Sequence, residues 1–186
     1  MATAIVLSLL VSGCAQGPSS GDNSGMVPAR LARALRKNAP GFERCAPAEF
    51  DPAILEFLAE PDSSDPGEKS PSLVRADFDG DGLEDAAMLQ CSSTEHRFVV
   101  VLDRKPEPLC IELSRWKREE RDARVRIGIY LQRLPAGTID LPNWDTGEVD
   151  TTMVLAHDAV EFVTFEKAAE AYFWSDGRFQ ELVTMD

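Results

Sequence analysis

The sequence predicts a single α+β domain in which N-terminal helices pack on a mostly antiparallel β-sheet. The predicted domain, residues 27–186, has the length of one ordinary globular domain. Helix signals are confined to residues 27–60, whereas the remainder contains short apolar or alternating segments with hairpin-sized connections. A parallel βαβ architecture would need helices between those segments, and the pattern does not supply them.

Two amphipathic segments predict the helices. Residues 27–37 carry Leu31 and Leu35 on one face, with basic side chains largely off that face. A second helix is expected over residues 51–60, because an Asp at the N-cap followed by a Pro in the first turn is a favourable start. Residues 61–71, rich in Asp, Ser, Pro and Gly, are expected to form an exposed connection.

The strand predictions rest on apolar runs and on alternation. Residues 98–102 are apolar at every position, which favours a central strand covered on both faces. Apolar and polar side chains alternate over residues 125–132, so this strand should have one buried face. Residues 160–165 and 171–174 are further strand candidates. Ser-Asp-Gly-Arg at 175–178 predicts a tight hairpin turn with a return strand after it.

The loop Asp-Phe-Asp-Gly-Asp-Gly-Leu-Glu-Asp, residues 77–85, predicts a calcium site. Ca²⁺ binds about six to eight oxygen ligands, and alternate residues of a tight loop can direct their carboxylates to one point. The two glycines allow the backbone to curl around the ion. An ordinary solvated turn is the alternative, but without a cation the four carboxylates would repel one another. The expected ligands are the side chains of Asp77, Asp79, Asp81 and Asp85 and the backbone carbonyl of Leu83.

The loop does not fit an EF-hand, which needs a Glu at its twelfth position and helices on both sides. The twelfth residue is Met88, within the apolar run 86–91, which predicts a strand. A D-x-D-G-D-G-x-x-D loop that leads directly into a strand resembles the calcium loops of FG-GAP and VCBS-type repeat proteins. The resemblance implies a bound calcium ion. The sequence holds one copy, so the propeller fold of those families is not expected.

The N-terminus has the features of a lipoprotein signal. Residues 1–13 are uncharged, and their apolar run is too short to span a membrane as a helix. Val-Ser-Gly-Cys then resembles the bacterial lipobox, which implies that Cys14 is lipidated and becomes the new N-terminus. Signal peptides carry a Lys or Arg before the apolar run, and this one does not. The alternative is therefore an apolar N-terminal segment of a cytoplasmic protein. Residues 14–26 predict a flexible tether with a reach of about 20 Å.

Charge limits the partners that the protein can bind. The formal net charge of -13 opposes nucleic-acid binding, which needs a basic face. Residues 115–126 are locally basic, and Trp144 lies among turn-forming residues. Both are candidate docking sites for a protein partner. The alternatives are a solvated connection with internal ion pairs and a Trp folded back onto the core.

The remaining cysteines and the histidines give weaker signals. Export to an oxidising compartment favours one disulfide, which we expect between Cys91 and Cys110, with Cys45 paired to either of them as the alternative. No close Cys/His spacing indicates a zinc site. His96 and His157 lie in no nucleophile motif, so His96 is expected in a solvated loop and no catalytic activity is expected.

Together these patterns predict a lipid-anchored protein of the bacterial cell envelope. It would face the periplasm, with the outer membrane favoured by the Ala that follows the lipobox Cys. It would act by binding and contain one structural calcium ion. The overall pattern also resembles small secreted bacterial proteins of uncharacterised role. The alternatives are a periplasmic hydrolase whose active site forms only in three dimensions, and a sensor that responds to calcium.

Overall fold

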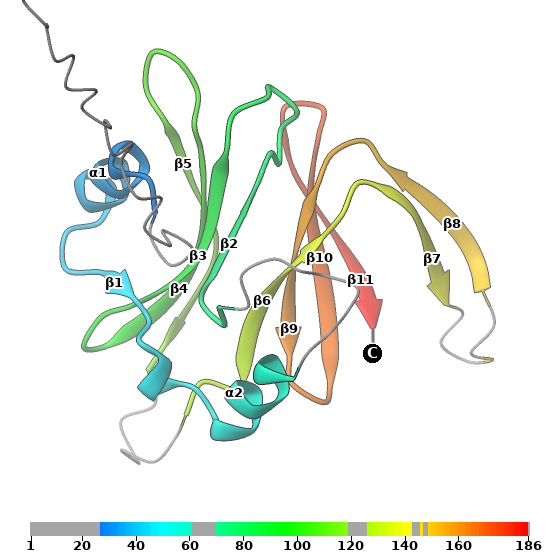
Figure 1. Ribbon diagram of the computed structural model, residues 1–186, viewed down its shortest axis with the longest axis horizontal. Helices are drawn as coiled ribbons and strands as arrows, with labels where there is room; N and C mark the ends of the chain where they lie inside the picture. The colour runs from blue at the N-terminus through cyan, green and yellow to red at the C-terminus, as the bar shows by residue number, and fades with distance from the viewer. Residues whose placement is uncertain (1–26, 61–69, 119–125, 143–145, 147–148, 186) are drawn as a thin grey trace, which may run out of the picture.

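The computed structural model describes residues 27–60, 70–118, 126–142, 146 and 149–185 (Figure 1). Cys14, the signal, the tether, Trp144 and part of the basic segment 115–126 lie outside these residues, so their predictions stay predictions. The described elements are α1 (Ala29–Asn38), β1 (Glu43–Arg44), the 3-10 helix η1 (Pro47–Glu49), α2 (Pro52–Ala59), β2 (Leu73–Ala76), β3 (Asp85–Cys91), β4 (Glu95–Leu102), β5 (Leu109–Lys117), β6 (Ile129–Leu134), β7 (Gly137–Pro142), β8 (Val149–Leu155), β9 (Ala159–Thr164), β10 (Ala168–Ser175) and β11 (Arg178–Met185).

The strands form two larger antiparallel sheets and one small one. In the first sheet the order is β1-β3-β4-β5, and β2 pairs with β3 on the same edge as β1, further along the strand. The second sheet has the order β11-β10-β9-β6. Strands β7 and β8 pair only with each other among the described strands, and they extend to one side of the larger sheets in Figure 1.

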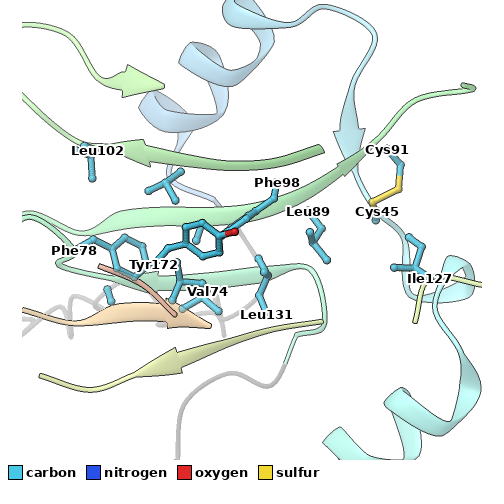
Figure 2. Close-up of a cluster of buried hydrophobic side chains, with 14 of the residues drawn as sticks. Cys45, Val74, Phe78, Leu89, Cys91, Phe98, Leu102, Ile127, Leu131 and Tyr172 are labelled. Carbon is cyan, nitrogen blue, oxygen red and sulfur yellow. A yellow bond between two sulfur atoms is a disulfide. The ribbon is translucent and has the colours of Figure 1, made fainter. Parts of the chain in front are cut away.

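The predicted α+β class is wrong, because the described chain is mostly β and its largest core lies between two sheets. The two α-helices have only 10 and 8 residues, too little to form a covering layer. Apolar side chains of β2, β3 and β4 instead pack against the second sheet (Figure 2). Leu131, Val160 and Tyr172 are the buried residues that β6, β9 and β10 contribute to this core.

Strand β4 confirms the prediction of a central strand covered on both faces. It lies between β3 and β5, and its side chains alternate between two cores. Phe98, Val100 and Leu102 face the second sheet, while Val99 and Val101 pack beneath the buried leucines of α1. All five are fully buried. Burying a side chain of this size stabilises the fold by about 1.5–3 kcal/mol, so β4 is a main source of stability.

Both predicted helices are present, and each covers a limited area. The N-cap of α2 forms as expected, since Asp51 Oδ1 accepts a hydrogen bond from the Ala53 amide at 2.9 Å. Ile54 is the fully buried residue of α2, and it packs with Tyr130 and Val163 of the second sheet. The α2 helix therefore lies against the second sheet, whereas α1 lies against the outer face of the first.

The predicted hairpin at the C-terminus is confirmed. Strands β10 and β11 pair antiparallel, with Ser175 opposite Arg178 across the turn. Asp176 and Gly177 both have positive φ angles, 52° and 78°, as a tight turn matching the strand twist requires. The strand predicted from residue 125 begins later, at Ile129, and the residues just before it include a parallel bridge from Ile127 to Phe50.

The expected disulfide between Cys91 and Cys110 is not formed. Cys91 is bonded to Cys45, and Cys110 is the free thiol among the described cysteines. The strand register gives the reason. Cys91 lies opposite His96 at one end of β4, whereas Cys110 lies opposite Val101 near the other end and on the far side of that strand. Strand β1 instead brings the chain beside the end of β3, where Cys45 can reach Cys91.

Candidate metal centre

The acidic loop joins β2 to β3, two paired antiparallel strands. Ala76 and Asp85 face each other across the ladder, so both ends of the loop are held by strand hydrogen bonds. Gly80 and Gly82 have φ angles of 77° and 82°. Residues with a Cβ adopt such angles only at a cost, and the two glycines permit the tight curl that the sequence predicted.

Three of the predicted ligands converge. Asp77, Asp79 and Asp85 each place a carboxylate oxygen within 4.8 Å of the others. An all-oxygen set of this kind fits a hard cation such as Ca²⁺. Asp81 is outside this group, and its Oδ1 accepts a hydrogen bond from the Leu83 amide at 2.8 Å. Asp81 and the Leu83 carbonyl remain predicted ligands that would have to turn toward the ion.

Hydrogen bonds within the loop hold the Asp77 carboxylate in place. Its two oxygens accept from the amides of Gly80 and Gly82, at 2.8 and 2.9 Å. These bonds use one lone pair on each oxygen, and each oxygen retains another for a cation. The glycine conformation and the Asp77 carboxylate therefore support each other before any ion binds.

Asp85 is the most deeply buried carboxylate of the group, with a relative exposure of 0%. It accepts hydrogen bonds from the Phe78 amide at 2.9 Å and from the Asp103 amide at 2.7 Å. Burial raises the pKa of Asp85 to about 6, and the negative charges of Asp79 and Asp81 act in the same direction, while the two amide bonds oppose the rise. A cation at the loop would favour the ionised form.

Arg104 gives the acidic loop a positive partner that sequence reasoning missed. Its Nε donates to Asp79 Oδ2 at 2.6 Å, and the Asp79 side chain is only 2% exposed. The Arg104 guanidinium also lies over the Trp174 ring, 4.6 Å from its centroid. This arginine would compete with a cation for one oxygen of Asp79. No local pattern could reveal it, because Arg104 follows β4 and Trp174 belongs to β10.

Helix α1 is linked to the same region through Arg30. The Arg30 guanidinium pairs with the Asp103 carboxylate and donates to the backbone carbonyls of Arg104 and Pro106, at 2.6 and 3.0 Å. The Asp103 amide in turn donates to Asp85. Two successive contacts therefore connect α1 to a predicted calcium ligand.

His157 lies directly over the loop, whereas the sequence indicated no role for it. A Cβ built on Gly80 would be 2.1 Å from His157 Cε1, closer than atoms can approach. Gly80 is thus required both for its φ angle and for the space that the imidazole occupies. The residues Asp79, Gly80, Asp81, Leu83, Arg104 and Lys105 line an open cavity of about 550 Å³ beside this contact.

The other candidate residues are not part of this centre. His96 was expected in a solvated loop, but it belongs to β4 and is only 8% exposed, because the strand begins earlier than predicted. In the basic segment, Arg115 pairs with Glu95 and Glu112, and Arg118 pairs with Glu49. These contacts are the internal ion pairs of the alternative interpretation, although residues 119–125 lie outside the description.

The fold and the loop define a two-sheet, mostly β domain with one acidic loop suited to a hard cation. No protein-family model, curated protein or solved structure matches this chain. Among the described residues, no helix is long and apolar enough to cross a membrane. Nothing among the described residues positively indicates an enzymatic activity.

Proposed function

We propose that this protein is a lipid-anchored component of the bacterial cell envelope that acts by binding and is stabilised by one calcium ion. The main support for the proposed calcium site is the convergence of Asp77, Asp79 and Asp85, whose carboxylate oxygens lie within 4.8 Å of one another. Calcium is plentiful outside the cytoplasm, which suits a loop with fewer ligands than an EF-hand.

Electrostatics favours a cation at this loop. At an effective dielectric constant of about 20, two ionised carboxylates at this separation repel by roughly 3 kcal/mol. Arg104 offsets part of the repulsion at Asp79 but is not paired with Asp77 or Asp85 by any of the contacts described above. A divalent ion would attract all three carboxylates and close the loop between β2 and β3. The proposed role of the ion is therefore to hold the loop and the ends of both strands.

The anchoring part of the proposal rests on the lipobox resemblance at Cys14. A lipid at Cys14 would hold the folded domain near the membrane through residues 15–26, and the first described residue after this tether is Val27. Expression of the full chain in a bacterium with a labelled fatty acid tests this part. We expect label in the parent and none in a Cys14→Ser variant, with the parent in the membrane fraction. An unlabelled, soluble parent would refute lipid anchoring.

Direct calcium binding tests the site itself. Equilibrium dialysis of the unlipidated chain should give one calcium ion per chain, with a Kd of about 10⁻⁴ to 10⁻³ M. Asp77→Asn should weaken binding, because it removes one charged ligand and one acceptor for the loop amides. Glu56→Gln is the matched control, since it removes one exposed carboxylate from α2 and leaves the loop intact. Equal binding by the two variants would contradict the proposed site.

A calcium sensor is the second candidate, favoured by the contacts from Arg30 through Asp103 to Asp85. If calcium shifts Asp85, it can alter how α1 holds the turn after β4. Hydrogen exchange of the α1 amides tests this role. A sensor predicts a calcium-dependent change in α1 that Arg30→Gln abolishes, whereas a purely structural ion predicts protection confined to the loop and its strands.

A hydrolase is the third candidate, because His157 lies against a loop that contains several carboxylates. Such a site could use the imidazole as a general base toward water held near the cation. Calcium-dependent hydrolysis of model phosphate and carboxylate esters, lost in His157→Gln, would support this candidate. Without such turnover, or with turnover that His157→Gln preserves, the hydrolase candidate is rejected.

A further inference from the structure

A second group of metal-ligating side chains lies away from the acidic loop, at one end of the core between the sheets. It contains the two cysteines of the disulfide. Cys45, Cys91 and Glu49 each place a ligand atom within 4.8 Å of the others. Both cysteines are buried, and Glu49 is partly exposed at the end of η1. Figure 2 shows the two sulfur atoms at one end of the core between the sheets, beside Leu89 and Ile127. The sequence did not predict this group, because Cys91 lies more than 40 residues from the segment that contains Cys45 and Glu49.

His96 is a fourth candidate ligand beside this group. Its ring nitrogens are not among the atoms that lie within 4.8 Å of one another, so its side chain would have to turn toward the sulfurs. It lies directly across the β3–β4 ladder from Cys91, so the two side chains project from the same face of the sheet. His96 is 8% exposed, and its Nδ1 is buried without a hydrogen-bond partner among the described residues. A buried imidazole nitrogen without a partner is costly. A metal ion is one partner that would satisfy it.

We propose that Cys45, Cys91, Glu49 and His96 form a zinc site in the reduced chain, which the disulfide replaces on oxidation. Two thiolates, one imidazole and one carboxylate are ligands that Zn²⁺ binds in a tetrahedral arrangement. The Cα atoms of the two cysteines are 5.0 Å apart. Rotation of the side chains can then separate the sulfurs to about 3.8 Å, which is the spacing of two thiolates bound to one tetrahedral zinc at about 2.3 Å.

Charges and hydrogen bonds from neighbouring residues act on two of the proposed ligands, His96 and Glu49. Burial lowers the pKa of His96, and the nearby charge of Arg118 acts in the same direction, while the charge of Glu49 opposes it. Glu49 accepts hydrogen bonds from the Ala46 amide at 3.0 Å and from Arg118 at 3.2 Å. Each carboxylate oxygen has a further lone pair for zinc.

The redox step requires an external dithiol or phosphine. A dithiol supplies two electrons and two protons to the Cys45–Cys91 bond, which breaks to give two thiols, and the donor becomes a disulfide. Zinc then binds the two thiolates and releases the two thiol protons. An external disulfide reverses the step: it takes two electrons from the Cys45 and Cys91 thiolates, becomes a dithiol, and leaves the sulfur–sulfur bond formed again and Zn²⁺ released. The site is independent of the calcium loop, so the two proposals can fail separately.

Cobalt titration tests the proposal, because Co²⁺ bound to thiolates gives a charge-transfer absorption band. The full chain is reduced with a phosphine under nitrogen and titrated with Co²⁺ in excess calcium, which occupies any oxygen-ligand site. We expect a thiolate band that saturates at one Co²⁺ per chain and is displaced by Zn²⁺. The oxidised chain should show no band. Absence of the band from the reduced chain would overturn the proposal.

Variants identify the ligands. His96→Gln should weaken Co²⁺ binding at least tenfold, since loss of a ligand costs no less than loss of an outer-shell partner. His157→Gln carries the same substitution outside the site and should bind as the parent does, as should Cys110→Ser. If His96→Gln binds Co²⁺ as tightly as the parent, or if Cys45→Ser keeps the thiolate band, the proposed ligand set is refuted.

Circular dichroism separates loss of the site from loss of the fold. If the reduced chain keeps its strand signal, the cobalt titration reports on a preformed site. If reduction unfolds the chain, stoichiometric Zn²⁺ should restore the strand signal in the parent but not in His96→Gln. A reduced parent that stays unfolded with zinc would count against the proposal as clearly as a missing thiolate band.

Discussion

Calcium should raise the thermal midpoint of this protein by an amount that the loop predicts. A ligand that binds only the folded state stabilises it by RT ln(1 + [L]/Kd). With Kd of about 10⁻⁴ to 10⁻³ M for a loop of this kind, 10 mM free Ca²⁺ gives about 1.4 to 2.7 kcal/mol. For a domain of this length each kcal/mol shifts the midpoint by about 2–4 °C, so the expected rise is about 3 to 11 °C.

The measurement is a thermal scan of the chain without its first 25 residues, in EDTA and in 10 mM CaCl₂. Asp79→Asn should lose about half to seven-tenths of the rise, because a tenfold weaker site contributes about 1.0 to 1.3 kcal/mol less at this calcium concentration. The exposed Glu56→Gln variant loses the same charge from α2 and should keep the full rise. Two results would refute the reasoning: an unchanged midpoint for the parent in calcium, or an equal rise in Asp79→Asn and the parent.

Three further predictions concern single side chains. Gly80→Ala should destabilise the protein by more than Gly82→Ala, because both positions have positive φ but only Gly80 lies against an imidazole. Urea unfolding of both variants, and of Gly80→Ala combined with His157→Ala, checks this, and equal losses for the two single variants would contradict it. Because the pKa of His96 is lowered in the folded state, its contribution to the free energy of unfolding is complete above about pH 6.5. That contribution declines as the pH falls below this value, because the unfolded chain binds the proton first. Stability measured from pH 8 to 5 should therefore fall more steeply in the parent than in His96→Gln, and parallel profiles would exclude the effect. Phe98→Ala should cost about 3–5 kcal/mol in chemical denaturation, since its ring is fully buried between the two sheets, and a loss below 1 kcal/mol would show that the core repacks.

Local sequence patterns predicted the elements whose formation depends on neighbouring residues. The N-cap at Asp51 and the Asp-Gly turn at 176–177 form as expected because their hydrogen bonds and φ angles involve residues adjacent in the chain. The acidic loop belongs to the same category, since its glycines and carboxylates alternate within nine positions. Residues 98–102 likewise revealed that β4 is covered on both faces, since apolar side chains at every position fit no exposed strand.

The errors concern contacts between residues far apart in the chain. The α+β prediction overestimated how much of the core the helices cover. Amphipathic periodicity shows that a helix has a buried face, but it does not show how large a part of the core that face covers. Sequence order favours a disulfide between Cys91 and Cys110, whereas β1 brings Cys45 to Cys91. Ser-Ser-Thr-Glu-His is typical of a turn and predicts a loop at His96, yet the strand extends through it.

The sequence alone determined that this chain has an acidic loop with two glycines, two short amphipathic helices and a doubly buried central strand, because each depends on spacing within a few residues. Calcium binding at the loop stays a prediction. Only the tertiary structure decided that two sheets enclose the main core, that Arg104 and His157 adjoin the loop, and that Cys45, Glu49 and Cys91 meet, with His96 opposite Cys91 on the neighbouring strand. The physical reason is strand pairing. It brings distant segments together through backbone hydrogen bonds whose partners carry no local signature.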